Sequence, residues 1–287
     1  MSRHPRLLLV PAALLMAVFF GAFLVFAAVG LLTSAPGTPG YGAPLTLHNY
    51  LRFFADPVGL GILGWTVMFS VVLTVATVLL GYPFAYLIAR TRWSWLRQIL
   101  LGVLLVTFLC GSISRAYGWL ILLGRRGLLN ELLLWTGLIE HPLALIYNVS
   151  GVFIALLHFT LPYFVLTVFG AIAAVPVQVE ESARDLGAGA IRVFFQITVP
   201  LTVPAVVGGA ALAFSLAISA FAFPLLLGGG RVRLISNYIY DQLFVAFDLP
   251  FAAAVSTLFL AVALAILLAF FAIERWATRA VYRRAEQ

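Results

Sequence analysis

The 287-residue sequence contains no lysine, a single cysteine and only four histidines. Without lysine the chain cannot build the phosphate-binding loop of a P-loop ATPase or form a Schiff base. Cys110 stands alone, so an internal disulfide is impossible and cysteine usage does not indicate a redox compartment. The histidines are too scattered to suggest a metal site: His4, His48, His141 and His158. We therefore expect neither a catalytic centre nor a metal or cofactor on this chain.

Charge is also scarce, since 9% of the residues are charged and 63% are hydrophobic, with a mean hydropathy of +1.10. A chain this apolar cannot cover its hydrophobic surface by folding as a soluble globule. Its apolar stretches exceed the roughly 20 residues that cross a bilayer, and their continuous hydrophobicity excludes barrel strands. We predict an all-α integral membrane protein with six transmembrane helices in one domain, residues 1–287. The expected spans are 7–32, 61–89, 98–124, 146–175, 198–228 and 250–274.

The arginines predict the orientation of the chain in the membrane. With six spans both termini share one side, which would hold eleven arginines against five on the other. Cytoplasmic loops carry the excess of basic residues, so we expect both termini and loop 176–197 in the cytoplasm. The eleven are Arg3, Arg6, Arg90, Arg92, Arg97, Arg184, Arg192, Arg275, Arg279, Arg283 and Arg284. The high pI of the chain is therefore explained by the arginines of its membrane topology, and we predict no nucleic-acid partner.

A polar segment, residues 181–200, follows the fourth expected span and leads into the fifth. Pro176 is favourable at the start of a short helix, and the acidic residues after it suit the positive end of the helix dipole. Gly187 fits the end of that helix, because glycine enters the left-handed conformation at little steric cost. A second short helix from Ala190 would lead into the fifth span. The segment is thus predicted to form an elbow of two short helices.

Both short helices carry apolar side chains on one face. Val179, Ala183 and Leu186 fall at i, i+4 and i+7 of the first helix. Bulkier residues belong to the second: Ile191, Phe194 and Phe195. Such an elbow is too small to bury these side chains within itself, so it needs a groove on another protein.

The elbow has a distinctive spacing: Glu181-Ser182-Ala183, three residues, Gly187, nine residues, then Ile197-Thr198-Val199-Pro200-Leu201. This spacing resembles the EAA loop of ABC importer permeases, the coupling segment through which a separate ATPase acts on membrane helices. Serine at position 182 departs from the usual alanine, a small change that should leave a tight elbow intact. The resemblance implies ATPase-coupling roles for Glu181, Ser182, Ala183, Leu186, Gly187, Ile197 and Pro200.

Segments outside the elbow resemble the spermidine/putrescine branch of these permeases, in particular the first of its two membrane subunits. They include Gly81-Tyr82-Pro83-Phe84-Ala85-Tyr86, Arg115-Ala116-Tyr117-Gly118-Trp119 and Pro250-Phe251-Ala252-Ala253-Ala254. Gly118 stands where the branch commonly has alanine. The resemblance implies a type I permease fold and a bacterial inner-membrane importer for polyamines or a related small organic solute.

The same resemblance implies a set of partners around this chain in the lipid bilayer. An ATPase dimer would bind ATP and Mg²⁺, and a solute-binding protein outside the membrane would deliver the solute. A second permease subunit would be a distinct homologous chain, with two copies of this chain as the alternative. Ferric iron, thiamine and opine-like amino compounds are alternative solutes. A secondary transporter driven by an ion gradient is a different class, which would ordinarily show intramembrane carboxylates or inverted repeats.

Apart from Glu274, the last residue of the sixth expected span, no aspartate or glutamate lies inside an expected span, and Arg115 is the one charge away from the span ends. Arg115 has two interpretations: it lines the translocation path with Ser112, Ser114 and Tyr117, or it braces helices by bonding to carbonyl groups. Neither gives a polycation a tight site, so selectivity should rest mainly with the binding protein. The further path candidates are Trp119, Tyr163, Ser215 and Ser219.

The third external segment, residues 228–248, contains polar and aromatic residues that we expect to be exposed. They are Asn237, Tyr238, Tyr240 and Asp241. Two interpretations are open for them: a docking surface for a partner, or an ordinary solvated loop.

Overall fold

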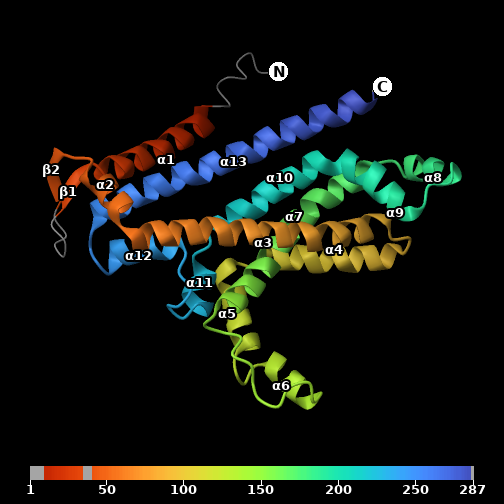
Figure 1. Cartoon of the computed structure of the whole chain (residues 1–287), viewed down its shortest axis with the longest axis horizontal. Coiled ribbons are helices and arrows are strands. Elements are labelled where there is room, and N and C mark those ends of the chain that lie inside the picture. The colour runs from red at the N-terminus through yellow and green to blue at the C-terminus, as the bar shows by residue number, and fades with distance from the viewer. Residues whose placement is uncertain (1–9, 35–40, 286–287) are drawn as a thin grey trace. The chain divides into compact units, whose positions relative to one another are not determined.

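The computed structural model describes residues 10–34 and 41–285 (Figure 1). Arg3, Arg6 and the first three residues of the first expected span lie outside the described residues. By its internal contacts the chain divides into two compact units. The first combines Met1–Leu63 with Ile235–Val262, and the second combines Gly64–Leu234 with Ala263–Gln287. The expectation of one functional domain stays a prediction.

The first unit contains helices and a short hairpin. Its elements are α1 (Val10–Val29), β1 (Leu32–Ser34), β2 (Tyr41–Leu45), α2 (His48–Ala55), the beginning of α3 (Pro57–Arg90), α12 (Ile235–Phe244) and the beginning of α13 (Leu249–Ala285). The antiparallel pairing of β1 with β2 was not expected in an all-α chain, but it involves only a few residues. None of the α1 side chains is buried, as suits a helix whose solvent is lipid.

The core of the first unit corrects the expectation for segment 228–248. Tyr238 of α12 is buried with Phe53, Ile235, Phe251 and Val255, and Asn237 is buried as well. The Tyr238 hydroxyl donates to Asp56 Oδ2 at 2.8 Å, and burial raises the pKa of this hydroxyl. The expected exposure is therefore wrong for Asn237 and Tyr238, because partners distant in sequence cover them.

The second unit carries most of the membrane helices. Besides the rest of α3 and α13, it contains α4 (Ser94–Leu109), α5 (Ser112–Leu123), α6 (Leu128–Trp135), α7 (Val149–Ala174), α8 (Val177–Asp185), α9 (Ala190–Val193), the π-helical turn η2 (Phe194–Thr198), α10 (Val199–Ile218) and α11 (Ala222–Leu227). Among the described residues, five helical segments are long and apolar enough to cross a membrane, or six if the bent pair of α4 with α5 and α6 is one span. The predicted all-α membrane fold is confirmed.

Two expected spans differ from straight helices. Residues 98–124 are divided at Cys110 and Gly111, where extended backbone separates α4 from α5 and the chain bends by 106° between Ser94–Leu109 and Ser112–Trp135. Residues 198–228 are divided after Ile218, and α11 begins at Ala222. Pro224 then lies in the first turn of α11, where its missing N–H costs nothing, whereas a helix running through it would lose a hydrogen bond.

Small residues let α3, α7 and α10 approach closely. A Cβ placed on Gly81 of α3 would lie 2.5 Å from Phe164 Cδ1 of α7. A Cβ placed on Gly209 of α10 would lie 2.9 Å from Phe164 Cδ2. The hydroxyls of Thr77 and Thr160 also meet at 2.9 Å between α3 and α7. Glycine contacts and buried hydroxyl bonds are typical of helix pairs in lipid, where burial of apolar surface does not drive association.

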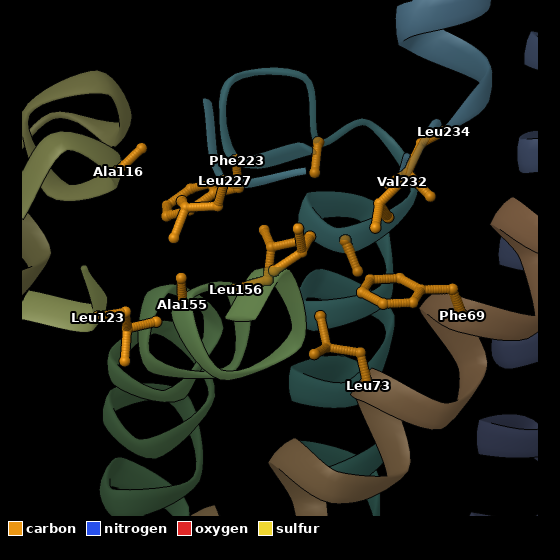
Figure 2. Packing of buried hydrophobic residues seen from close by; sticks show 13 residues of the cluster. Phe69, Leu73, Ala116, Leu123, Ala155, Leu156, Phe223, Leu227, Val232 and Leu234 are labelled. Carbon is orange, nitrogen blue, oxygen red and sulfur yellow. The ribbon is translucent and has the colours of Figure 1, made fainter. Parts of the chain in front are cut away.

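A hydrophobic cluster joins α3, α5, α7 and α11 at the point where the divided spans meet. Figure 2 shows its side chains pointing toward one another: Phe69 and Leu73 from α3, Ala116 and Leu123 from α5, Ala155 and Leu156 from α7, and Phe223 and Leu227 from α11. Val232 and Leu234 close it from the segment after α11. The break after Ile218 is thus backed by packed side chains, since Ala217 and Ala220 on either side of it belong to the cluster.

Candidate functional site

The elbow (residues 176–197) has the predicted architecture. Pro176 is the N-cap of α8, and Gly187 follows its end with φ +89°. Gly187 N donates to Arg184 O at 2.8 Å and Ala188 N donates to Ala183 O at 3.0 Å, the two bonds of a Schellman motif. The second short helix, α9, begins at Ala190 as expected. Figure 1 shows α8 and α9 at the ends of α7 and α10.

The elbow presents a bulky apolar surface that the chain itself does not cover. Leu186 is 90% exposed, Ile191 77% and Phe195 62%. Glu181 and Ser182 are exposed beside them, while Ala183 is partly buried. Exposed apolar groups gathered on a segment between two membrane helices indicate a site for a protein partner. We call Leu186, Ile191 and Phe195 the elbow face.

A buried carboxylate lies beneath the elbow, and it belongs to Glu180 rather than Glu181. Glu180 is 1% exposed. Its Oε1 accepts from Arg90 Nη2 at 2.7 Å, from Arg90 Nε at 3.0 Å and from the Thr198 hydroxyl at 2.9 Å. Its Oε2 lies 3.4 Å from the Tyr86 hydroxyl and 3.7 Å from Arg184 Nη2. We call these five residues the Glu180 cluster.

The charge of Glu180 is stabilised within this cluster. Burial raises the pKa of the Glu180 carboxyl, but the hydrogen bonds from Arg90 and Thr198 and the positive charge of Arg90 outweigh that effect. The pKa therefore lies below its ordinary value, and the carboxylate is ionised at neutral pH. Arg90 ends α3, where a positive charge also suits the negative end of the helix dipole.

A π-helical turn connects the elbow to α10. Val199 N donates to Phe194 O, a bond that spans one residue more than in an α-helix. Pro200 follows directly and has no N–H to donate to the turn before it. The turn contains Thr198, which is fully buried and donates to Glu180, and Ile197, which is partly buried. The predicted junction of the elbow with the fifth span is therefore a wide helical turn.

Arg115 has the geometry of a brace across the break between α4 and α5. Its Nη2 donates to the carbonyls of Thr107 and Cys110, and its Nη1 donates to Phe159 O at 3.4 Å. The guanidinium carbon also lies 4.8 Å from the centre of the Phe159 ring. Arg115 is 7% exposed, so these carbonyls replace water around its charge. Lining of the path by Arg115 stays a prediction.

The other path candidates do not form one group. Trp119 Nε1 donates to His158 Nδ1 at 3.2 Å, a partner that the sequence did not suggest. The Tyr163 ring packs at a tilt against Phe159, the residue that also contacts Arg115, with ring centres 5.4 Å apart. Ser112 and Tyr117 are exposed. Ser215 and Ser219 donate to carbonyls of their own helical segment, so their hydroxyls are satisfied without a ligand. Among the described residues, no cluster of three or more His, Cys, Asp or Glu could hold a metal ion.

Comparison with known protein families identifies the family of the chain that contains this elbow. Residues 81–285 match the model of the binding-protein-dependent transport system inner membrane component family. The chain belongs to this family. This inner membrane component is therefore a multi-pass transport subunit with the type I permease fold, and ATP hydrolysis belongs to a separate subunit.

Curated relatives of this inner membrane component include permeases named for polyamine transport. The chain is 37% identical over 211 residues to the spermidine/putrescine transport system permease protein PotB of Escherichia coli (strain K12), with 74% of this chain and 76% of the relative covered. The PotB protein of Haemophilus influenzae is 32% identical over 233 residues, with 81% and 80% covered.

A solved structure shows the same fold. It is the crystal structure of a bacterial alginate ABC transporter in complex with an alginate pentasaccharide-bound periplasmic protein. The match has a TM-score of 0.77 at 16% identity and covers 95% of this chain and 94% of the other. At that identity the likeness concerns the fold alone.

Sequence reasoning assigned none of the five members of the Glu180 cluster to the site. It singled out Glu181, whereas the structure buries the preceding Glu180 with Arg90 and Thr198. One signal was present, because Arg90 directly follows the second expected span and needs a partner if it is not solvated. The choice between two adjacent glutamates depends on which face of α8 meets α3, and the sequence does not contain that information in any local pattern.

Proposed function

We propose that this permease subunit imports polyamines of the spermidine and putrescine type across the bacterial inner membrane, powered by a separate ATPase dimer. The elbow is the observation that carries the proposal, since it offers the exposed elbow face on a base held by a buried ion pair. The polyamine class is supported by the similarity to the PotB permeases of two bacteria.

In this proposal the elbow face occupies a groove on the ATPase. ATP and Mg²⁺ are bound on the ATPase dimer, and this chain contributes no cofactor. Glu181, Ser182, Ala183, Leu186 and Gly187 shape the docking unit. When the ATPase dimer closes, the elbow moves with it, and Ile197 and Pro200 pass the displacement to α10 through the π-helical turn.

The proposal includes an orientation and further partners. Both termini and the elbow face the cytoplasm, in agreement with the excess of arginine on that side. A solute-binding protein delivers the polyamine from outside, and a distinct homologous permease chain completes the path. Because Arg115 is the one charged residue away from the ends of the expected spans, selection of a polycation is assigned to the binding protein.

Transport by the complete importer in proteoliposomes tests the proposal. The chain is reconstituted with its second permease and ATPase, and uptake of radiolabelled spermidine is measured with the solute-binding protein present. We expect uptake that requires hydrolysable ATP and the binding protein, and that unlabelled putrescine inhibits. Uptake driven by a proton or sodium gradient without ATP would contradict it. Thermal shifts of the binding protein with spermidine, putrescine, ferric iron and thiamine identify the solute independently.

A further inference from the structure

The Glu180 cluster joins three separate segments of the chain at one carboxylate, and Arg90 links them to a fourth. Glu180 itself belongs to α8, Tyr86 and Arg90 to the end of α3, and Thr198 to the turn that begins α10. Arg90 Nη2 donates in addition to Val175 O at 3.1 Å, the carbonyl of the residue that caps α7. The side chains of Glu180 and Arg90 are 2% and 13% exposed, so water does not compete for these bonds.

The elbow has a second attachment to the same helices, and that attachment is apolar. Phe194 of η2 packs edge-on against Tyr82 and Tyr86 of α3, with ring centres 5.5 Å and 5.0 Å apart. Aromatic contacts of this kind hold segments together but tolerate tilting and sliding. Directional bonds to a buried charge fix an angle as well as a distance. Loss of the Glu180 bonds would therefore leave the elbow attached but free to pivot.

We propose that Glu180 is a positioning residue for energy coupling, acting through Arg90 and Thr198. The cluster holds α8 in one orientation against the ends of α3, α7 and α10, so that displacement of the elbow moves these helix ends as one body. With the cluster broken, the ATPase still binds the elbow face, but part of each displacement pivots α8 instead of moving the helices. The inference rests on the proposed function.

The distribution of contacts separates this role from docking. Glu180 is buried on the side of α8 that meets the helix ends, whereas Leu186, Ile191 and Phe195 are exposed. A substitution at Glu180 therefore leaves the elbow face chemically unchanged. Arg184 is the exposed member of the cluster: its Nη2 lies 3.7 Å from the Glu180 carboxylate, and its side chain is 47% exposed. It therefore contributes less than Arg90 to holding the carboxylate in place.

The test measures how many spermidine molecules enter proteoliposomes for each ATP hydrolysed by the complete importer. Glu180→Gln keeps the shape of the side chain and removes its charge. We expect the ratio to fall about tenfold, within the range of typical coupling energies, while the ATPase still copurifies and ATP hydrolysis continues. Arg90→Gln should give the same fall. Because both substitutions break one pair, the double variant should be no worse than either single variant.

Arg92→Gln is the matched control. Arg92 lies two residues after Arg90, is exposed, and has no ion pair among the residues that the structure describes. Its ratio should equal that of the unsubstituted importer. An unchanged ratio in Glu180→Gln, or loss of the ATPase from that variant, would overturn the inference. Failure of the unsubstituted importer to move spermidine with ATP would instead overturn the proposed function, and the inference would fall with it.

Discussion

Alanine at position 187 should damage the elbow through backbone strain alone. Gly187 has φ +89°, and no atom lies within 4 Å of the place where a Cβ would be, so alanine meets no clash. An L-residue in the left-handed region costs about 1–2 kcal/mol. If the ATPase binds only elbows whose backbone keeps this left-handed turn, the population of permease that can bind the ATPase falls about 5- to 30-fold, since 1.36 kcal/mol is a factor of ten.

The measurement is ATP-dependent spermidine uptake at equal amounts of membrane-inserted subunit, together with the affinity of the ATPase for the permease. Asparagine tolerates the left-handed region better than alanine, so Gly187→Asn should retain more uptake and affinity than Gly187→Ala. The matched control is Gly189→Ala, because Gly189 has φ −67° and equally open surroundings. Equal activity of the alanine variants at positions 187 and 189 would refute the reasoning.

Three further predictions concern the helices and the buried charge. Gly81→Ala should destabilise the purified subunit by about 1–3 kcal/mol through overpacking against Phe164, and adding Phe164→Leu should restore part of its thermal stability; equal melting of the single and double variants would contradict this. Arg115→Met should remove the donors to the carbonyls of Thr107, Cys110 and Phe159, at a cost of about 1–3 kcal/mol, and lower the melting temperature, whereas Tyr117→Phe at an exposed position should not; similar melting of the two would contradict the brace. Because the pKa of Glu180 is depressed, the stability that its charge contributes is fully present above the ordinary glutamate pKa, and it is lost only as the pH falls through the lower folded-state pKa. Glu180→Gln should therefore remove that loss of stability from an acid-unfolding curve. An unchanged curve would argue against the cluster.

The sequence predicts the features that local chemistry determines. Hydrophobic length alone indicates the spans, because a helix in lipid must satisfy its own backbone. Gly187 could be assigned to a helix end because glycine is the residue best suited to a left-handed turn. The spacing from Glu181 to Pro200 then placed the elbow before the correct span, and the structure confirms both short helices.

Features that depend on distant residues could not be predicted in the same way. Glu180 and Glu181 are adjacent and chemically identical, and the choice between them is made by Arg90, which lies 90 residues earlier in the chain. The break at Cys110 and Gly111 has no charge or proline to mark it. Tyr238 is polar enough to be expected at a surface, but Asp56 accepts its hydroxyl and apolar neighbours cover its ring.

The central claim is that the elbow face binds a separate ATPase, and site-specific photo-crosslinking in the assembled importer tests it most directly. A photoreactive phenylalanine analogue replaces Phe195 on the elbow face or, as a control, Phe271 on α13, which is 54% exposed. We predict that the analogue at position 195 traps the ATPase and that the analogue at position 271 does not. Trapping of the ATPase at 271 and never at 195 would contradict the account.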